Sequence, residues 1–277
     1  MRPAWLDKKI SLNACSGMKE TLRSLRVETV CEQAMCPNIG ECFGRREATF
    51  LILGRQCTRM CSFCNVKKGK PLPPDSGEPA RVAEAAAKFS LKHVVITSVT
   101  RDDLADGGAG IFAETVLRIR KRSPAVKIEI LIPDFRLSRD AIMLVVKSCP
   151  DIIAHNIETV PSLYDVTRKG ADYGRSLRVL RLIRDISPHM KTKSGIMLGM
   201  GESAAEVYSV MKDLRSAGCD FLSIGQYLAP SRGHYPVKEY IAPDKFMRYK
   251  EEGAKMGFAH IESGPYVRSS YMAGNYL

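Results

Sequence analysis

The 277-residue chain is 45% hydrophobic and 26% charged, the balance of an ordinary globular protein with a substantial core. It holds no apolar run long enough to span a bilayer, and residues 1–9 lack the apolar centre of a signal peptide, so we expect neither a membrane protein nor a secreted one. Nine cysteines then predict a cytoplasmic protein whose thiols serve metals or catalysis, and the net charge of +12 favours acidic partners.

Residues 1–47 form an N-terminal section with little strand character. A helix is expected over residues 17–30, and it leads directly into three cysteines, Cys31, Cys36 and Cys42. Gaps of four and five residues separate them, and Pro37-Asn38 and Gly40 predict a turning loop. This triplet is the first candidate metal centre.

From residue 48 onward the chain alternates between strand and helix patterns. The expected strands cover residues 48–53, 93–98, 127–132, 151–158, 191–198 and 220–225. A helix is expected after each strand; one of them opens with a capping box at Ser203 and Glu206. Six strand–helix units imply a parallel sheet with helices outside, and no Gly-x-Gly-x-x-Gly fingerprint supports a dinucleotide fold. We therefore predict a partial (β/α)6 barrel over residues 48–257, with residues 1–47 and 258–277 as extensions that cover its mouth.

A second cysteine triplet, Cys57, Cys61 and Cys64, follows the first expected strand, with gaps of three and two residues. Thiolates this close can converge on one centre only if the backbone loops around it. Three thiolates are one ligand short for a structural zinc and one short for a [4Fe–4S] cluster, so such a cluster keeps one iron open to a ligand that is not protein. A zinc knuckle is the alternative, although no fourth ligand lies nearby at ribbon spacing. Two triplets predict two metal centres.

The spacing of this second triplet, with Phe63 before its last cysteine, resembles the signature of radical S-adenosylmethionine (SAM) enzymes. With both triplets present, most of the chain from Cys31 onward resembles the lipoyl synthase family. Ser62, Asn65 and Lys169 depart from the family pattern, but none is a metal ligand. The other matching blocks are Thr97-Ser-Val-Thr-Arg-Asp-Asp-Leu104, Ile132-Pro-Asp-Phe135, His155-Asn-Ile-Glu158, Gly170-Ala-Asp-Tyr173, Thr192-Lys-Ser-Gly195, Gly225-Gln-Tyr-Leu228 and Gly264-Pro-Tyr-Val-Arg-Ser-Ser-Tyr271.

The resemblance implies insertion of two sulfur atoms, at the sixth and eighth carbons of an octanoyl group. That group is carried on a lysine of a lipoyl carrier protein, either a 2-oxoacid dehydrogenase lipoyl domain or the glycine-cleavage H protein. It further implies two [4Fe–4S] clusters, SAM and an electron donor, with the cluster at Cys57, Cys61 and Cys64 cleaving SAM to a radical and the other donating sulfide. Lipoyl domains are generally acidic, which suits the basic chain. A monomer that binds neither nucleic acid nor membrane is expected.

Site residues follow from the same resemblance. In the family a serine of the Arg-Ser-Ser-Tyr motif completes the auxiliary cluster beside Cys31, Cys36 and Cys42, and its position here is Ser270. The residues expected to bind SAM are Thr97, Ser98, Asn156, Glu158 and Arg168. Strand alternation would place Asn156 and Glu158 on one face.

Lys193 and Arg168 could each be a surface cation instead of a SAM ligand. Cys149, on an apolar helix face, and Cys219, before a buried strand, are expected to be small core residues. Cys15 has no assignment.

Two other functions stay open on the residues alone. A methylthiotransferase-like enzyme with two clusters would suit the basic charge, but no RNA-binding domain follows the expected barrel. A nucleic-acid-binding module stapled by zinc or a cluster is the non-enzyme alternative. It lacks support because the sequence has neither a repeated zinc finger nor an RNP-type aromatic pair.

Overall fold

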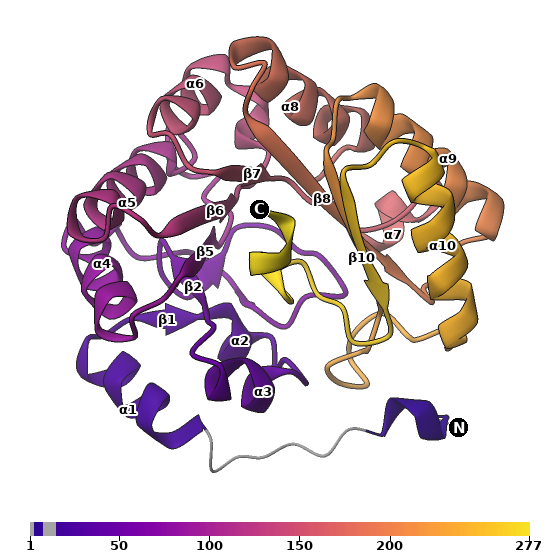
Figure 1. The fold of residues 1–277 in the computed structure, drawn as a ribbon, viewed down its shortest axis with the longest axis horizontal. Helices are drawn as coiled ribbons and strands as arrows, with labels where there is room; N and C mark the ends of the chain where they lie inside the picture. The colour runs from indigo at the N-terminus through magenta and orange to yellow at the C-terminus, as the bar shows by residue number, and fades with distance from the viewer. Residues whose placement is uncertain (1–2, 8–14) are drawn as a thin grey trace.

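The computed structural model describes residues 3–7 and 15–277, and an eight-stranded sheet curls through its centre in the order β1-β2-β5-β6-β7-β8-β9-β10. Figure 1 shows the strands forming a ring with helices around the outside. Seven strands run parallel, while β1 (Glu28–Thr29) pairs antiparallel with β2 at one edge. Among the described residues β1 and β10 are the two edges of the sheet, so the barrel is not closed by hydrogen bonds.

The six predicted strand–helix units are all present, and the predicted partial (β/α)6 barrel is confirmed. The parallel strands are β2 (Thr49–Ile52), β5 (His93–Ser98), β6 (Lys127–Leu131), β7 (Ile152–Ala154), β8 (Lys191–Leu198), β9 (Phe221–Gln226) and β10 (His260–Gly264). The outer helices are α4 (Glu78–Lys88), α5 (Ala109–Arg122), α6 (Arg139–Lys147), α8 (Tyr173–Ile186), α9 (Ala204–Ser216) and α10 (Pro243–Lys255). The seventh parallel strand, β10, was not predicted, because Ile261 is its only fully buried side chain.

The N-terminal extension differs from the prediction in two ways. The expected helix over residues 17–30 stops early, since α1 (Ser16–Ser24) ends before β1. The first cysteine triplet was predicted in a loop, but it spans two short helices, α2 (Val30–Gln33) and α3 (Ile39–Gly44). The Thr29 hydroxyl starts α2 by accepting the backbone N–H of Glu32 at 3.3 Å.

The barrel interior contains an ion pair between Lys193 and Glu129, whose side chains are 0% exposed and lie 3.0 Å apart. Burial disfavours both charges, but Lys193 holds the pKa of Glu129 below its usual value. The ring of Tyr276, the penultimate residue, lies 3.7 Å from the Lys193 nitrogen. Lys193 is therefore neither a surface cation nor a wall residue of the cavity described below; it anchors the end of the chain inside the barrel (Figure 1).

The two cysteines expected in the core have different outcomes. Cys219 is fully buried, as predicted. Cys149 is exposed, and the prediction was wrong because α6 ends at Lys147 and Cys149 has a φ of 56°. The cause is local: Pro150 follows, and a residue before proline is disfavoured in helical geometry. Across the part of the chain that the structure describes, no helix has both the length and the apolar character to cross a membrane.

The capping box predicted for α9 is present. Ser203 accepts the backbone N–H of Glu206 at 3.3 Å, and the Glu206 carboxylate accepts the backbone N–H of Ser203 at 2.8 Å. Ser203→Ala is expected to lower the free energy of unfolding by about 1 kcal/mol, because it leaves an N-terminal helix donor unpaired. Urea unfolding measures this. Ser209→Ala, an exposed change within the same helix, is the matched control and should have little effect; equal losses in the two variants would contradict the cap's contribution.

Candidate functional site

A cavity of about 360 Å³ lies inside the barrel, where its walls reach the carboxyl ends of β5, β6 and β7. Both cysteine triplets contribute to its lining: Cys31 and Cys36 from the first, and Cys57, Cys61 and Cys64 from the second. We call it the central cavity. In a parallel barrel this end of the strands is where reactive groups gather.

The loop that carries Cys57, Cys61 and Cys64 is held by its backbone. Its first cysteine lies in β3 (Gln56–Cys57), which pairs with β4 (Lys67–Lys68). The Thr58 N–H donates to Thr100 O at 3.1 Å, and the Cys57 sulfur accepts the Thr100 N–H at 3.3 Å. The start of the loop, at Cys57 and Thr58, is therefore fixed to the segment that follows β5.

Arg59, between the first two cysteines of this loop, forms the densest ionic contact of the site. Its guanidinium donates to Asp102 at 2.8 and 3.0 Å and to Asp134 at 2.9 and 2.6 Å. Arg59 and Asp134 are 8% and 1% exposed. These contacts hold the pKa of Asp134 well below its usual value against the effect of burial. Arg175 adds a further bond to Asp134 at 2.7 Å, so the cluster loop is tied to α8 as well as to two strand ends.

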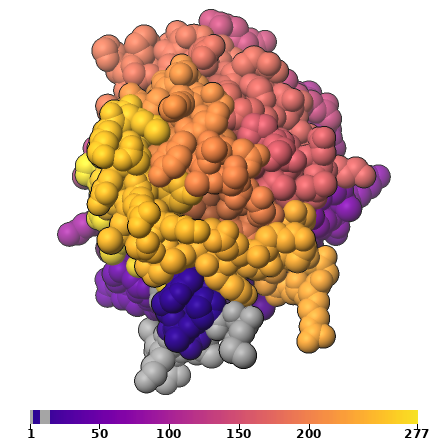
Figure 2. Space-filling view, turned by 90° about the vertical axis from the view of Figure 1, so that its right-hand side faces the viewer, coloured from indigo at the N-terminus to yellow at the C-terminus, as the bar shows by residue number. Residues whose placement is uncertain are grey.

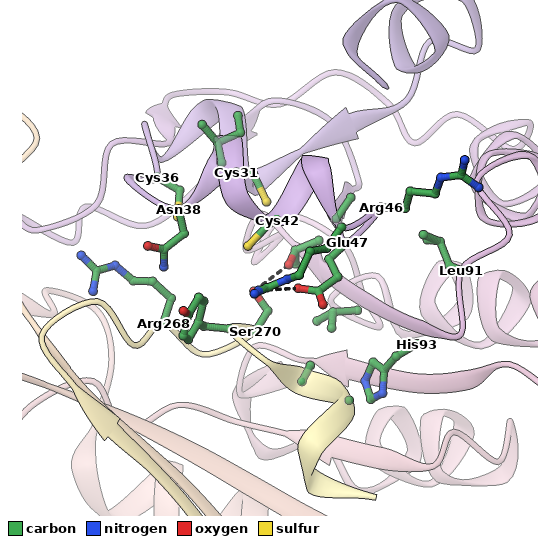
Figure 3. Close-up of a pocket in the computed structure, with 18 of the residues that line it drawn as sticks. Cys31, Cys36, Asn38, Cys42, Arg46, Glu47, Leu91, His93, Arg268 and Ser270 are labelled. Carbon is green, nitrogen blue, oxygen red and sulfur yellow. Dashed lines mark hydrogen bonds and ion pairs between the residues drawn. The ribbon is translucent and has the colours of Figure 1, made fainter. Parts of the chain in front are cut away.

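The first triplet opens on a second cavity, of about 460 Å³, which we call the rear cavity. Figure 3 shows its lining, with the sulfurs of Cys31 and Cys42 on one side and Ser270 opposite. Cys36 also lines it, so the three cysteines and Ser270 share one space. The Ser270 hydroxyl accepts a hydrogen bond from Thr49 at 2.7 Å. Ser270 lines the central cavity too, and it therefore lies between the two sites.

Three hydrogen bonds to the N-terminal extension hold the C-terminal segment in the place where Ser270 borders both cavities. The Asn38 amide donates to Tyr266 O at 2.7 Å, and the Tyr271 hydroxyl donates to Glu41 at 3.0 Å. Figure 2 shows the N-terminal turn, in indigo, against the yellow C-terminal part, where the Tyr266 hydroxyl donates to Leu6 O. Gly225 allows the close approach, since a Cβ there would lie 2.1 Å from the Val267 carbonyl oxygen.

The extensions were expected to cover the barrel mouth, and residues of both extensions, among them Ala34, Pro37 and Ser269, line the central cavity at that end. The rear cavity reaches further, since it is also lined by residues 47–49 and 90–93, which lie at or before the amino ends of β2 and β5. The first triplet and Ser270 thus extend through the lumen toward the opposite end of the barrel from the Cys57 loop.

All five residues expected to bind SAM line the central cavity: Thr97, Ser98, Asn156, Glu158 and Arg168. Strand alternation was the wrong reason for the pairing of Asn156 with Glu158. β7 ends at Ala154, and Glu158 has a φ of 67°, yet the Asn156 amide donates to its carboxylate at 3.1 Å.

Arg168 is not a surface arginine. It is 9% exposed and donates to Tyr164 Oη at 2.9 Å and to the Asn156 carbonyl at 3.1 Å. Burial raises the pKa of Glu158, and the nearby positive charge of Arg168 counters this. Glu158, Asn156 and Arg168 thus form a polar wall of the central cavity, with a carboxyl group, an amide and a fixed cation.

Sequence reasoning gave no role to three other residues of this cavity. The Ser269 hydroxyl donates to Asn156 at 3.1 Å, which connects the C-terminal segment to the expected SAM residues. His155 places Nδ1 2.9 Å from Ile132 O, and burial lowers its pKa to about 4, so it is neutral at physiological pH. Arg59 is the third. The family blocks that contain His155 and Ser269 were the available signal for those two residues.

The donor sets fit iron–sulfur clusters. Each triplet supplies three soft thiols, and burial raises the pKa of Cys31 to about 12 and of Cys42 and Cys64 to about 11. These thiols keep their protons in the metal-free chain, so metal binding must displace those protons. Cys57, Cys61 and Cys64 line the central cavity together with the polar residues Asn156, Glu158 and Arg168, which suits an incompletely ligated cluster with a polar ligand.

A barrel of this kind with an open three-cysteine site defines a radical SAM enzyme, and the profile described as "Radical SAM superfamily" matches residues 51–225. HydG, a maturase of the [FeFe]-hydrogenase, has a similar fold, with a TM-score of 0.62 and 11% identity over 91% of this chain and 63% of that one. The chain belongs to the lipoyl synthase family. It is 61% identical to the lipoyl synthase of a Geobacter species, over 100% of this chain and 94% of that protein. It is 60% identical to the lipoyl synthase of Geobacter metallireducens, over 99% and 97% respectively. Family membership assigns [4Fe–4S] clusters and SAM as its cofactors.

Proposed function

We propose that the chain inserts two sulfur atoms, at the sixth and eighth carbons of an octanoyl group on a lysine of a lipoyl carrier protein. The observation that carries this proposal is the position of Ser270. It lies in one cavity with Cys31, Cys36 and Cys42, and it also borders the cavity lined by Cys57, Cys61 and Cys64. A radical source and a sulfur source then border the same space, which sulfur insertion at an unactivated carbon requires.

Cys57, Cys61 and Cys64 would hold one cluster, and Cys31, Cys36, Cys42 and Ser270 the other. When bound, these clusters with SAM supply a radical that breaks unactivated C–H bonds and a sulfide that replaces the hydrogen. The chain's own residues position the reactants and exclude water. Ile132 and Val99, 3% and 2% exposed, give the central cavity an apolar wall on which an alkyl chain can lie.

The polar wall would hold SAM. Arg168 suits the methionyl carboxylate because it is a buried cation. The backbone carbonyl groups of Thr97 and Ser98 can accept hydrogen bonds from the methionyl amino group. Asn156 and Glu158 suit the ribose hydroxyls, since together they offer both donors and acceptors. The Ser269 bond to Asn156 keeps the amide in place.

Glu158→Gln is expected to weaken SAM binding about tenfold, because a charge-assisted hydrogen bond is lost while the shape is kept. Equilibrium dialysis of the cluster-containing protein measures the dissociation constant, and iron content confirms that the clusters remain. Glu262→Gln, which changes a carboxylate paired with His260 outside the cavity, is the control. An unchanged dissociation constant would remove Glu158 from the SAM site.

We propose that the chain has three functional segments. Residues 1–47 carry the ligands of the sulfur-donating cluster, residues 48–257 form the radical-generating barrel, and residues 258–277 supply Ser270. The partners are octanoylated lipoyl domains or H protein and an electron donor. We propose that the chain works in the cytoplasm as a monomer.

The direct test supplies an octanoyl-lysyl peptide, SAM and a reductant to the anaerobic protein. A mass gain of two sulfur atoms, with about eight irons per chain, is the expected result. Zinc in place of iron, or an unmodified peptide with SAM cleaved, would overturn the proposal.

A further inference from the structure

The Cys57–Cys64 loop is surrounded by four exposed segments that bond directly to it or extend from it. Ser62 joins two of them: its N–H donates to Thr167 O at 2.9 Å, and its carbonyl accepts the Tyr235 N–H at 3.0 Å. The Asn65 amide, just past the loop, reaches Gln33 O at 2.7 Å. The fourth segment, residues 66–70, returns to the loop through the Gly69 N–H, which donates to Cys57 O at 3.1 Å. Together these segments form a collar around the radical-generating site.

The collar is strongly basic. Residues 57–70 and residues 231–238 contain no Asp or Glu at all. Asp165 is the exposed acid of the segment around Thr167, and the half-buried Glu32 precedes Gln33 in the segment that Asn65 contacts. Six exposed cations lie in the collar: Lys67, Lys68, Lys70, Lys169, Arg232 and Lys238. Charges at this density attract an acidic partner and raise its rate of encounter.

Within this basic collar lie exposed apolar side chains. Met35 and Met60 are 68% and 56% exposed, and Val166 is 56% exposed. Met60 belongs to the cluster loop itself. The Val166 carbonyl accepts a hydrogen bond from the Ser62 hydroxyl of that loop, and Met35 lies two positions after Gln33, which Asn65 contacts. An apolar centre with a charged rim is the usual anatomy of a protein interface. No Phe, Tyr or Trp among the described residues is one of the large hydrophobic side chains left exposed, and Phe63 and Tyr235 of the collar are half-buried, which disfavours the stacking of RNA bases.

We propose that this collar is the docking surface for an acidic protein domain that presents an acylated lysine to the central cavity. This inference rests on the proposed function, which supplies the acyl-lysine, but the surface itself is argued from charge and exposure. Flexible methionines suit such a role because they can adapt to carriers of different shape. The rim attracts the domain, and the apolar centre holds it while its lysine enters the barrel.

The test compares two triple variants with the same change in net charge. The collar variant is Lys67→Glu, Lys70→Glu and Arg232→Glu. The control variant is Lys121→Glu, Lys147→Glu and Lys212→Glu, three exposed positions on the outer helices α5, α6 and α9. Fluorescence anisotropy at low and high salt measures the dissociation constant for an acidic octanoylated carrier domain. The collar variant is expected to bind about tenfold more weakly than wild type at low salt, and the control within about twofold.

Equal losses in the two triple variants would overturn the docking surface, and so would unchanged binding by the collar variant. Tighter binding of an RNA of mixed sequence than of the acidic domain would also overturn it. Sulfur insertion into a short uncharged octanoyl-lysyl peptide tests the proposed function alone, because such a peptide does not need the rim. A wild-type chain that binds the domain through the collar but leaves the peptide unchanged would contradict the proposed function and keep the docking surface.

Discussion

Ser270→Cys is expected to keep the sulfur-donating cluster and slow sulfur insertion by about tenfold or more, a barrier increase of at least about 1.4 kcal/mol. The reason is the chemistry of the fourth ligand. In the proposed ligand set a serine oxygen is a hard donor beside three soft thiolates, so it would be the ligand most easily released when sulfide leaves the cluster. A fourth thiolate would hold its iron more firmly. Single-turnover assays measure the transfer rate, and iron content measures cluster retention.

Ser263→Cys is the matched control for this prediction. It makes the same chemical change in the same C-terminal segment, at a hydroxyl that donates to Phe246 O at 2.7 Å and lines neither cavity. Its transfer rate should match that of the wild type. Unchanged transfer in Ser270→Cys would mean that release of the serine does not limit the reaction, and loss of four irons would mean that the site does not accept a thiolate.

Arg59→Ala is expected to lower the free energy of unfolding of the cluster-free chain by about 3 kcal/mol. It leaves Asp134, which is 1% exposed, without its closest cation, although Arg175 still contacts that carboxylate. The loop of Cys57, Cys61 and Cys64 also loses its tie to Asp102. Reconstituted protein should therefore hold about four irons instead of about eight, all at the first triplet.

Arg136→Ala separates this effect from a general loss of positive charge. Arg136 also faces Asp102, at 3.5 Å, but its side chain is 66% exposed, and exposed pairs contribute little. Its removal should change the free energy of unfolding by less than about 0.5 kcal/mol. Similar unfolding curves for the two variants, measured in urea, would show that the buried contacts of Arg59 do not hold the loop.

The barrel was predictable because its strands are buried on both faces and read as apolar runs. Residues 93–98 and 191–198 match β5 and β8 at both ends. β10 escaped prediction because a strand with one buried side chain has no readable pattern. The helices of the first triplet escaped because four and six residues are too few to show a helical period.

The site was predictable only in part. Cysteine spacing indicated both centres, whereas Ser270 came from resemblance, since nothing local connects it with Thr49, 221 positions away. The partners of Arg59 lie 43 and 75 positions along the chain, at the ends of different strands. Such contacts depend on how the barrel brings strand ends together, which a single sequence does not state.

The route of the C-terminal segment through the lumen has a consequence for how the protein matures. The cysteines proposed to hold the radical-generating centre lie close together, between Cys57 and Cys64. The ligands proposed for the sulfur-donating centre lie on both sides of the barrel in the chain, because Cys31, Cys36 and Cys42 precede β2 and Ser270 follows β10. The whole barrel must therefore be synthesised before the second ligand set can come together, whereas the first set is available early. We expect the sulfur-donating centre to be the later of the two to form.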